Sequence, residues 1–472
     1  MADHTRTQPV GELLRTGTGE PSPQLVLVMN SSNPAESTVR VLLDEFQEVL
    51  VGRGPARAFT IDKRQRGKQS LRVALADDFV STQHVRFSRA NGGWWFEDIG
   101  SKNGTYLDGE RTVKASLYDQ ALIEIGRSMF LYRIGEVHDA QPIVSDDELA
   151  APSMRLRTFS GALAAQFAKL AAVASSRTSV LALGETGTGK GVLARALHEL
   201  SGRSPFVAVN LATISENLLT AELFGYRKGA FSGAVADHRG LVRAADGGTL
   251  FLDELGDLPA AAQSALLLML QDREVLPIGH SSPVAVDVRV VAATNKDLPD
   301  LVEAGRFRKD LLARLEGLTL RLPTLADRRE DLGLLIREIV HRESPCPGAV
   351  TLGNLAARAL MLYEWPGNIR ELEKVLTAAM SLSRGTPIET KHLPEGLRSC
   401  LTGDQPSSGA SRVGATSREG FDPKSKQAVV ELLRRFGGNV SAAARSIGKK
   451  HQQLFKWIKA HGIDVESLRP KT

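Results

Sequence analysis

The alternation of apolar and polar residues changes character along the chain, and its first part consists of short strands. Apolar runs recur from about residue 24 to residue 134, separated by turn-forming pairs such as Asn103-Gly104 and Asp108-Gly109. The clearest runs lie at 25–28, 39–42, 94–96 and 130–132. Many short strands at this spacing predict a β-sandwich. We place it at residues 23–135, after a polar N-terminal tail at 1–22 that we expect to be disordered.

A second pattern begins near residue 154, where predicted helices alternate with apolar strands. These strands lie at 180–183, 206–209, 249–252 and 288–293. Such alternation is typical of a parallel α/β core, which we place at 154–398. An acidic segment at 136–153 and a Ser/Gly-rich segment at 399–420 are interpreted as linkers. The remainder, 421–472, has the pattern of a small helical domain with helices at 422–436, near 440–447 and at 449–461. The chain is therefore predicted to be multidomain.

Charge and composition change this picture mainly at the C-terminal end. The chain carries a formal charge of +5, but residues 421–472 hold eleven Lys and Arg against four Asp and Glu. A basic tail on a near-neutral body indicates an anionic partner, nucleic acid first, although a solvated basic helix would have the same composition. Cys346 and Cys400, the two cysteines, lack metal-ligand spacing. With no apolar run of membrane length and no signal peptide, we expect a cytoplasmic protein that does not contact a membrane.

A glycine-rich loop follows the first apolar strand of the α/β core and opens a helix. Its residues are Gly184, Glu185, Thr186, Gly187, Thr188, Gly189, Lys190 and Gly191. Strand, glycine loop and helix form the context of a phosphate-binding loop, in which backbone N–H groups and the lysine hold the phosphates of ATP. The alternative is a glycine-rich loop that precedes a lysine by chance. The helix is predicted to bury one apolar face, made of Val192, Leu193, Ala196, Leu197 and Leu200.

Two carboxylates end a later apolar strand of this core. Asp253 is expected to hold Mg²⁺, and Glu254 to polarise the attacking water. An acidic pair in this position is otherwise a common helix cap. The ordinary phosphate loop has Ser or Thr after its lysine, whereas this chain has Gly191. Magnesium would therefore depend more on Asp253, phosphate oxygens and water.

From Gly184 to Leu372 the sequence closely resembles the AAA+ domain of the sigma-54 activators, the bacterial enhancer-binding proteins. The most specific part is a loop that has the sequence GAFTGA in this family and engages sigma-54. Here the loop consists of Gly229, Ala230, Phe231, Ser232, Gly233 and Ala234. The resemblance implies a central α/β AAA+ ATPase with a helical lid and sigma-54 RNA polymerase as a partner. An ordinary mobile glycine loop is the alternative for this segment.

The same resemblance implies roles for six further positions. Asn210 matches the residue that couples the catalytic glutamate to the nucleotide state, and Thr294 with Asn295 matches sensor I. Arg308 and Arg314 match the arginine fingers that reach the neighbouring subunit, and Arg370 matches sensor II. Arginines acting in trans imply a ring, a hexamer by resemblance.

The front domain resembles a forkhead-associated (FHA) domain, a β-sandwich that binds phosphothreonine peptides through its loops. The residues that carry the resemblance are Arg53, Ser81, Thr82, Lys102 and Asn103. Arginine, lysine and hydroxyl groups suit a phosphate, and Asn103 suits a peptide backbone. His84 is interpreted as a buried structural histidine. The alternative is that Asn103-Gly104 is a simple hairpin turn and Arg53 a surface charge.

The tail resembles the Fis-type helix-turn-helix that ends most sigma-54 activators. Its last helix would lie in the major groove of double-stranded DNA, at enhancer sites upstream of promoters. The residues expected near bases and phosphates are Lys450, His451, Gln452, Gln453 and Lys456. Leu454, Phe455 and Ile458 are predicted to face the core, and Trp457 suits either role. A protein-docking module is the alternative.

Together these features predict a transcription activator that hydrolyses ATP to remodel sigma-54 RNA polymerase and is regulated by a phosphothreonine-containing protein. The second hypothesis is a DNA- and phosphopeptide-binding regulator whose ATPase core serves only as a scaffold, suggested by Gly191 and Ser232.

Overall fold

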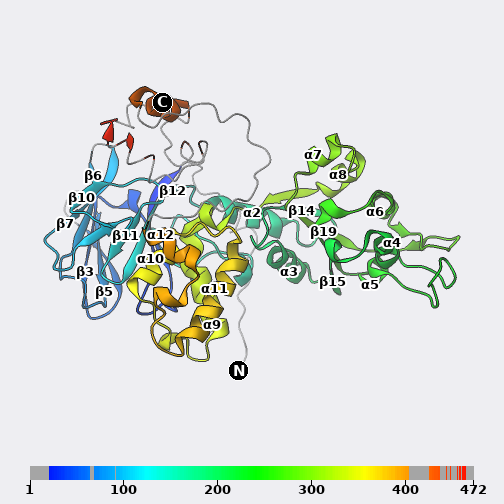
Figure 1. The fold of residues 1–472 in the computed structure, drawn as a ribbon, viewed down its shortest axis with the longest axis horizontal. Coiled ribbons are helices and arrows are strands. Elements are labelled where there is room, and N and C mark those ends of the chain that lie inside the picture. The colour runs from blue at the N-terminus through cyan, green and yellow to red at the C-terminus, as the bar shows by residue number, and fades with distance from the viewer. Residues whose placement is uncertain are drawn as a thin grey trace. The chain divides into compact units, whose positions relative to one another are not determined.

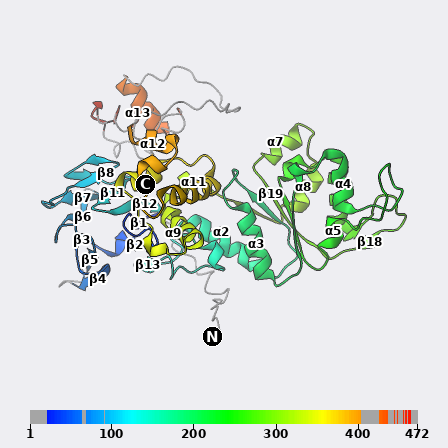
Figure 2. The same cartoon turned by 60° about the horizontal axis from the view of Figure 1, so that its bottom comes forward.

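The computed structural model of the 472-residue chain describes residues 21–63, 69–90, 92–402 and 425–435, together with isolated positions between 443 and 463. Two compact units divide the chain, residues 1–405 and residues 406–472, and each is treated by itself. Figures 1 and 2 give two views of the ribbon. Among the described residues, no helix combines the length and apolar character that a membrane span requires.

The front of the first unit is a sandwich of two mainly antiparallel sheets, coloured blue and cyan in Figure 1. The seven-stranded sheet has the order β13-β2-β1-β12-β11-β8-β9, and the six-stranded sheet has the order β10-β7-β6-β3-β5-β4. The strands of the first sheet are β1 (Ser22–Asn30), β2 (Val39–Leu42), β8 (Thr105–Leu107), β9 (Glu110–Arg111), β11 (Leu122–Ile125), β12 (Ser128–Gly135) and β13 (Ile143–Ser145). Those of the second are β3 (Glu48–Arg53), β4 (Ala58–Lys63), β5 (Gln69–Leu75), β6 (Val85–Ala90), β7 (Gly93–Asp98) and β10 (Lys114–Ser116).

The sandwich confirms the predicted front domain and corrects one of its boundaries. All four apolar runs lie in strands. The segment 136–153, predicted to be a linker, contains β13, which pairs with β2 and buries Val144 completely. The acidic composition of the segment hid this strand, because its three residues are too few to give a period.

The seven-stranded sheet is apolar on both of its faces. In β1, Leu25 and Leu27 belong to the core between the two sheets, whereas Val26 and Val28 belong to a second core shared with the helices that follow residue 325. Successive strand residues point to opposite faces. A continuous apolar run in a strand therefore indicates burial on both sides.

The centre of the first unit is a five-stranded parallel sheet with the order β15-β16-β19-β14-β20. Its strands are β14 (Val180–Leu183), β15 (Phe206–Asn210), β16 (Thr249–Asp253), β19 (Arg289–Thr294) and β20 (Leu318–Arg321), with a separate ribbon of β17 (Glu274–Val275) and β18 (Val284–Ala285). The helices of this domain are α2 (Gly161–Ala172), α3 (Lys190–Ser201), α4 (Glu216–Phe224), α5 (Leu241–Ala244), α6 (Ala260–Asp272), α7 (Leu298–Glu303) and α8 (Lys309–Leu315). This architecture confirms the predicted parallel α/β core.

A helical lid follows the sheet, in yellow and orange in Figures 1 and 2. It comprises η5 (Leu325–Asp331), α9 (Leu332–Glu343), α10 (Asn354–Leu362), α11 (Asn368–Ser383) and α12 (Glu395–Thr402). Its apolar residues form one core with those of β1, β11 and β12.

The second unit is described in part. Its helix α13 (Lys426–Arg435) lies within the predicted helix at 422–436. Leu454 and Ile458 are buried beside Val429, Leu433 and Ala443, and Trp457 packs against this cluster. The burial of Leu454 and Ile458 confirms their predicted core position. The DNA-contacting candidates Lys450, His451, Gln452, Gln453 and Lys456 lie outside the described residues, as does Phe455.

Candidate nucleotide site and partner-binding loops

The glycine-rich loop joins the carboxyl end of β14 to the first residue of α3. Gly187 and Gly189 have φ angles of +82° and +106°, a region that residues with a side chain rarely adopt. A Cβ at Gly187 would lie 2.3 Å from the carbonyl oxygen of Gly367 in the lid. The sequence therefore needs glycine here for conformation and for close approach. The loop lies at the carboxyl end of β14, which has β19 on one side and β20 on the other, and open parallel sheets bind ligands outside the carboxyl ends of their strands.

Lys190 is buried at the start of α3 and turns back into the loop. Its Nζ donates to the carbonyl oxygens of Gly184 at 2.8 Å and Glu185 at 3.0 Å. Burial lowers the pKa of this ammonium, the carboxylates of Glu254 and Asp253 oppose the shift, and Arg370 adds to it. These charges surround the position where phosphates would enter. On the same helix, Leu193, Ala196 and Leu197 are buried as predicted, but Val192 is 45% exposed and was wrongly placed on the apolar face.

The two predicted carboxylates lie at the carboxyl end of β16. Asp253 is the last strand residue, and its Oδ1 accepts from the backbone N of Glu254 at 3.1 Å. Glu254 has a left-handed backbone with φ +57°, a strained conformation for a residue with a side chain, costing about 1–3 kcal/mol. Such strain is common at functional positions. Two carboxylates beside phosphates suit Mg²⁺, which takes one or two protein carboxylates with phosphate oxygens and water.

The neighbouring strands bring three more predicted residues to this edge. Asn210 ends β15 directly opposite Asp253 in the strand register. Thr294 ends β19, and its carbonyl oxygen accepts from Gly184 N at 3.3 Å. Asn295 Nδ2 donates to Thr186 Oγ1 at 3.3 Å. The carboxyl ends of the parallel strands thus place Asn210, Asp253 and Asn295 along one edge of the sheet, where Asn295 contacts the loop directly.

The lid closes on the loop from the other side through residues that sequence reasoning missed. Ile369 N donates to Gly187 O at 3.0 Å, and Asn368 Nδ2 donates to Thr186 O at 3.1 Å. Arg328, buried in η5, donates to Thr188 O at 2.7 Å. Arg370, which was predicted, lies in the first turn of α11, where its charge acts on Lys190. An arginine in a charged run and an asparagine at the start of a helix look like surface residues in sequence, so only the fold reveals these contacts.

Gly191 occupies an open position. A Cβ there would meet its nearest atom, Phe251 Cε1, at 3.9 Å, and its φ angle is not in the positive range. The fold therefore accepts a side chain at this residue.

Arg308 and Arg314 lie on the exposed α8 side of the domain. Arg308 donates to both carboxylate oxygens of Asp310, at 3.0 and 2.8 Å, and to Ser264 Oγ at 3.1 Å. These contacts raise the pKa of Arg308, with the Asp310 hydrogen bonds as the largest cause. The Arg308 side chain is thus hydrogen-bonded to Asp310 at the surface and does not contact Lys190 of its own chain.

The segment around Phe231 is a loop with a closed base. The backbone of Tyr226 forms isolated β-bridges with His238 and with Ile278. Gly229 N donates to Ala234 O at 2.8 Å. The Phe231 side chain is 36% exposed and packs edge-on against Tyr226, with ring centroids 4.9 Å apart. Val235, which sequence reasoning did not select, is 82% exposed next to it. The loop therefore presents two apolar side chains on a fixed base.

The FHA-like loops bring the predicted phosphothreonine residues together. Arg53 N donates to Ser81 O at 2.9 Å, and Lys102 N donates to Ser81 Oγ at 3.1 Å. The neighbouring Thr82 is exposed, and Asn103 Nδ2 donates to Phe79 O at 2.8 Å. The Arg53 side chain is 49% exposed. The cationic and hydroxyl residues Arg53, Ser81, Thr82 and Lys102 therefore lie together in neighbouring loops.

His84 lies beneath these loops and is fully buried, as predicted. Its Nδ1 accepts from Ser81 N at 3.1 Å, and its Nε2 lies 3.3 Å from Gly104 O. This arrangement requires a neutral ring with the proton on Nε2. Burial lowers the pKa of His84, in agreement with the neutral form.

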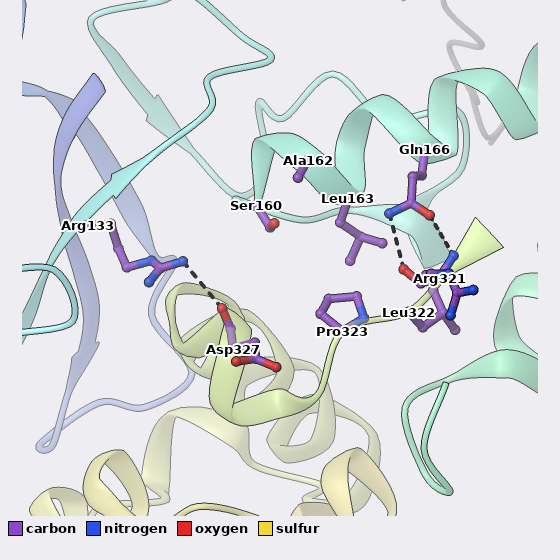
Figure 3. Close-up of a pocket in the computed structure, with 9 residues that line it drawn as sticks. All are labelled: Arg133, Ser160, Ala162, Leu163, Gln166, Arg321, Leu322, Pro323 and Asp327. Carbon is purple, nitrogen blue, oxygen red and sulfur yellow. Dashed lines mark hydrogen bonds between the residues drawn. The ribbon is translucent and has the colours of Figure 1, made fainter. Parts of the chain in front are cut away.

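A cavity of about 350 Å³ lies where the sandwich, the ATPase domain and the lid meet (Figure 3). Its described lining comes from β12, from α2 with the residue before it, and from the segment that runs from the end of β20 into η5. Arg133 and Asp327 face each other across it, and Arg133 Nη2 donates to the Asp327 carbonyl at 3.3 Å. The cavity thus marks the junction of three parts, and its described lining includes no residue of the phosphate loop.

Comparison with protein families defines the class of each described domain. Residues 156–321 match the Sigma-54 interaction domain, residues 326–409 match the AAA+ ATPase lid domain, and residues 49–126 match the FHA domain. The chain therefore carries an AAA+ ATPase domain of the sigma-54 activator kind, its lid and an FHA domain.

Individual relatives agree with this class. The chain is 43% identical over 308 residues to the DNA-binding transcriptional activator HyfR of Escherichia coli, covering 63% of this chain and 46% of the relative. It is 38% identical over 366 residues to the acetoin catabolism regulatory protein of Cupriavidus necator, covering 74% and 54%. The chain thus spans about half the length of these curated relatives. Among solved structures, NtrX from Brucella abortus in complex with ADP has 28% identity and a TM-score of 0.48, covering 67% of this chain and 70% of NtrX.

Proposed function

We propose that the protein is a sigma-54-dependent transcription activator that hydrolyses ATP to remodel sigma-54 RNA polymerase into the open complex. The observation that carries the proposal is that Lys190 and Asn295 contact one loop, with the charge of Asp253 acting on Lys190, in a domain that also presents the Phe231 loop. A nucleotide site and an apolar contact loop in one domain suit a machine that converts ATP turnover into movement of a partner.

The chemistry follows from the positions of these residues. The loop N–H groups and Lys190 bind the phosphates, and Glu254 orients and polarises the attacking water. Asp253 holds Mg²⁺, which neutralises phosphate charge when bound. Asn210 lies next to Asp253 in the sheet and couples the position of the Glu254 side chain to the state of the bound nucleotide. Thr294, Asn295 and Arg370 sense the phosphates from β19 and the lid.

A ring, in our proposal a hexamer, completes each site. Arg308, just before α8, and Arg314, within it, are both exposed, so both are available to a neighbouring subunit. An arginine supplied in trans stabilises the charge of phosphoryl transfer. Asp310 holds Arg308 in the separate chain, and assembly would transfer the guanidinium from Asp310 to phosphate.

Three further regions, the Phe231 loop, the basic tail and the FHA loops, would bind the partners of the ring. The loop from Gly229 to Ala234 would contact sigma-54, with Phe231 as the apolar anchor. The basic tail would bind double-stranded DNA upstream of the promoter. Arg53, Ser81, Thr82, Lys102 and Asn103 would bind a phosphothreonine-containing protein.

Gly191 is the observation that favours a second candidate, a regulator whose ATPase core is only a scaffold. Without a side chain at this position, the metal loses one protein ligand of ordinary phosphate loops. ATP hydrolysis by the assembled protein separates the two candidates.

The experiment is a Glu254→Gln variant compared with wild type for ATP binding, ATP turnover and open-complex formation. We expect the variant to bind ATP, to lose turnover by about 10²–10⁴-fold, the usual contribution of a general base, and to fail to open promoters. Normal opening by this variant would overturn the proposal. Absence of turnover in the wild type would favour the scaffold.

A further inference from the structure

The two loops that carry most of the candidate phosphothreonine residues run side by side and touch at two points. At one point, Lys102 N donates to Ser81 Oγ at 3.1 Å. At the other, Asn103 Nδ2 donates to Phe79 O at 2.8 Å. Phe79 therefore lies a short way along the same surface from the residues proposed to hold the phosphate.

Phe79 is an exposed aromatic residue with a cation stacked on its ring. The residue is 45% exposed. The guanidinium carbon of Arg127 lies 4.6 Å from the centroid of the Phe79 ring, within the range of cation–π attraction. Arg127 lies in the turn between β11 and β12 and is also exposed, and within the described part of the chain it forms no ion pair. The two residues thus present an aromatic ring and an available positive charge, which we call the Phe79–Arg127 platform.

A buried carboxylate fixes the backbone of this platform. Asp77 is only 6% exposed. Its Oδ1 accepts from Phe79 N at 2.9 Å, and its Oδ2 accepts from Arg127 N at 2.6 Å. Gly126, before Arg127, has a φ angle of +61°, and a Cβ there would lie 2.5 Å from Asp77 Oδ2. The platform is therefore preorganised, and ordering it on binding costs little.

Cations outnumber carboxylates on this surface. The exposed cations that border the loops are Arg53, Lys102, Arg111 and Arg127. In the described loops 76–84 and 99–111, the exposed carboxylates are those of Asp78 and Glu110. The Asp78 side chain is 99% exposed and approaches Arg53 only to 4.0 Å, so water screens this pair. Electrostatic complementarity therefore favours a partner with negative charge beyond one phosphate.

We propose that the Phe79–Arg127 platform is a second subsite of the phosphothreonine site and binds an acidic side chain of the same peptide. The inference rests on the phosphothreonine role proposed above. A carboxylate would accept charge-assisted hydrogen bonds from the Arg127 guanidinium, which the Phe79 ring holds in a stacked position. An extended peptide advances roughly 3.3 Å per residue, so the acidic residue lies a few positions from the phosphothreonine. The partner is thus an acidic phosphorylated segment.

The test scans the position of one acidic residue in a phosphothreonine peptide, with the full-length chain as the receptor. All other positions of the parent peptide are alanine, and Asp or Lys replaces one alanine at a time on either side of the phosphothreonine. Fluorescence anisotropy gives dissociation constants for wild type, Arg127→Ala and Arg127→Glu. The matched control is Arg89→Glu, which makes the same change of charge at a 59% exposed arginine of β6.

We expect wild type to prefer Asp over Lys by roughly tenfold or more at one position or two adjacent ones, the effect of a hydrogen bond to a charged group. Arg127→Ala should lose this preference, Arg127→Glu should reverse it, and Arg89→Glu should keep it. Equal affinities for Asp and Lys at every position would overturn the proposal. So would an Asp preference that survives Arg127→Glu, or a loss of equal size for every peptide, which indicates a general charge effect.

The aromatic ring is tested separately. Phe79→Leu keeps an apolar side chain and removes the ring on which the guanidinium stacks. The Asp preference should fall about two- to fivefold, the range of an exposed cation–π contact, while the affinity for the alanine peptide stays unchanged. An Asp preference equal to that of wild type would overturn the stacked platform.

Failure of the proposed function gives a different result. If wild type binds phosphorylated and unphosphorylated peptides equally, the phosphothreonine role is wrong, but an Asp preference that depends on Arg127 would still support the subsite. Double-stranded DNA is included as a competitor, because cations also attract nucleic acid. Displacement of the peptides by DNA that Arg127→Ala abolishes, without any Asp preference, would overturn the proposal.

Discussion

The two candidate phosphate-binding sites of this protein are built in opposite ways. The nucleotide loop uses backbone groups of glycines together with Lys190, which is only 7% exposed. The FHA loops use side chains at the surface, and that of Arg53 is 49% exposed. A buried charge interacts strongly and leaves a large penalty when its partner is lost. An exposed charge is hydrated and screened. The contrast predicts a strong, salt-tolerant nucleotide site and a weaker, adjustable phosphopeptide site.

The largest expected effect is at Lys190. Lys190→Ala should weaken ATP binding by about 100-fold, because truncating one partner of a buried charged contact costs about 2–5 kcal/mol. The control is Lys169→Ala, an exposed lysine of α2. Titration with a fluorescent ATP analogue measures both variants. Equal affinities in the two variants would contradict a phosphate role for Lys190.

A smaller loss is expected at Arg53. Arg53→Ala should weaken phosphothreonine-peptide binding by about 10–100-fold, since a hydrogen bond to a charged group contributes about 1.5–3 kcal/mol. Arg89→Ala, in which a 59% exposed arginine of β6 is removed, should bind like wild type. Fluorescence anisotropy with phosphorylated and unphosphorylated peptides measures the difference. If wild type binds both forms equally, the FHA loops do not read phosphate.

The salt dependence of ligand affinity should distinguish the nucleotide site from the phosphopeptide site. Raising the salt from about 0.1 M to 1 M shortens the screening length from about 10 Å to about 3 Å. We expect phosphopeptide affinity to fall several-fold more than ATP affinity over this range. Parallel titrations of one preparation provide the comparison. Equal salt dependence would show that exposure does not distinguish the sites.

Acid should affect the FHA site through His84. The pKa of the folded ring lies below the ordinary value of 6.5 because of burial. The unfolded state then binds the proton more readily, so the free energy of unfolding falls as the pH drops below about 6.5. Thermal unfolding at pH 7.5 and pH 5.5 measures this loss. His84→Asn, which keeps an acceptor for Ser81 N, should have a flatter pH dependence than wild type.

The smallest effect is expected at Gly191. Gly191→Glu should stabilise α3 by about 0.5–1 kcal/mol, because the position is open and glycine is unfavourable in a helix. The negative charge also suits the first turn of a helix. ATP turnover should be retained, and thermal unfolding should show a slightly raised midpoint. Destabilisation would mean that the loop needs glycine at this residue too.

The strands of the ATPase core and the functional residues at their carboxyl ends could be predicted well from local sequence. The run at 180–183 before Gly184, and the carboxylates after 249–252, predicted the sheet edge on which Asp253 and Asn295 now lie. Periodicity and glycine spacing are local signals, and parallel strands bring their carboxyl ends together by geometry. The interpretation of His84 as a buried structural histidine is confirmed as well.

Contacts between domains could not be predicted in the same way. The run from Leu25 to Met29 indicated a strand, but no local signal shows that Val26 and Val28 meet a lid more than 300 residues later. Arg328 likewise depends on distant backbone, and β13 was hidden in an acidic segment. Their partners are far away in sequence, so their role appears only in the folded chain.

The most direct test of the central claim is open-complex formation by sigma-54 RNA polymerase at a promoter with a site for this protein. We predict open complexes with wild type only when ATP can be hydrolysed. Phe231→Ala should keep ATP turnover and lose opening, whereas Leu382→Ala, at an equally apolar surface residue of α11, should keep both. Opening without ATP hydrolysis, or normal opening by Phe231→Ala, would contradict the account.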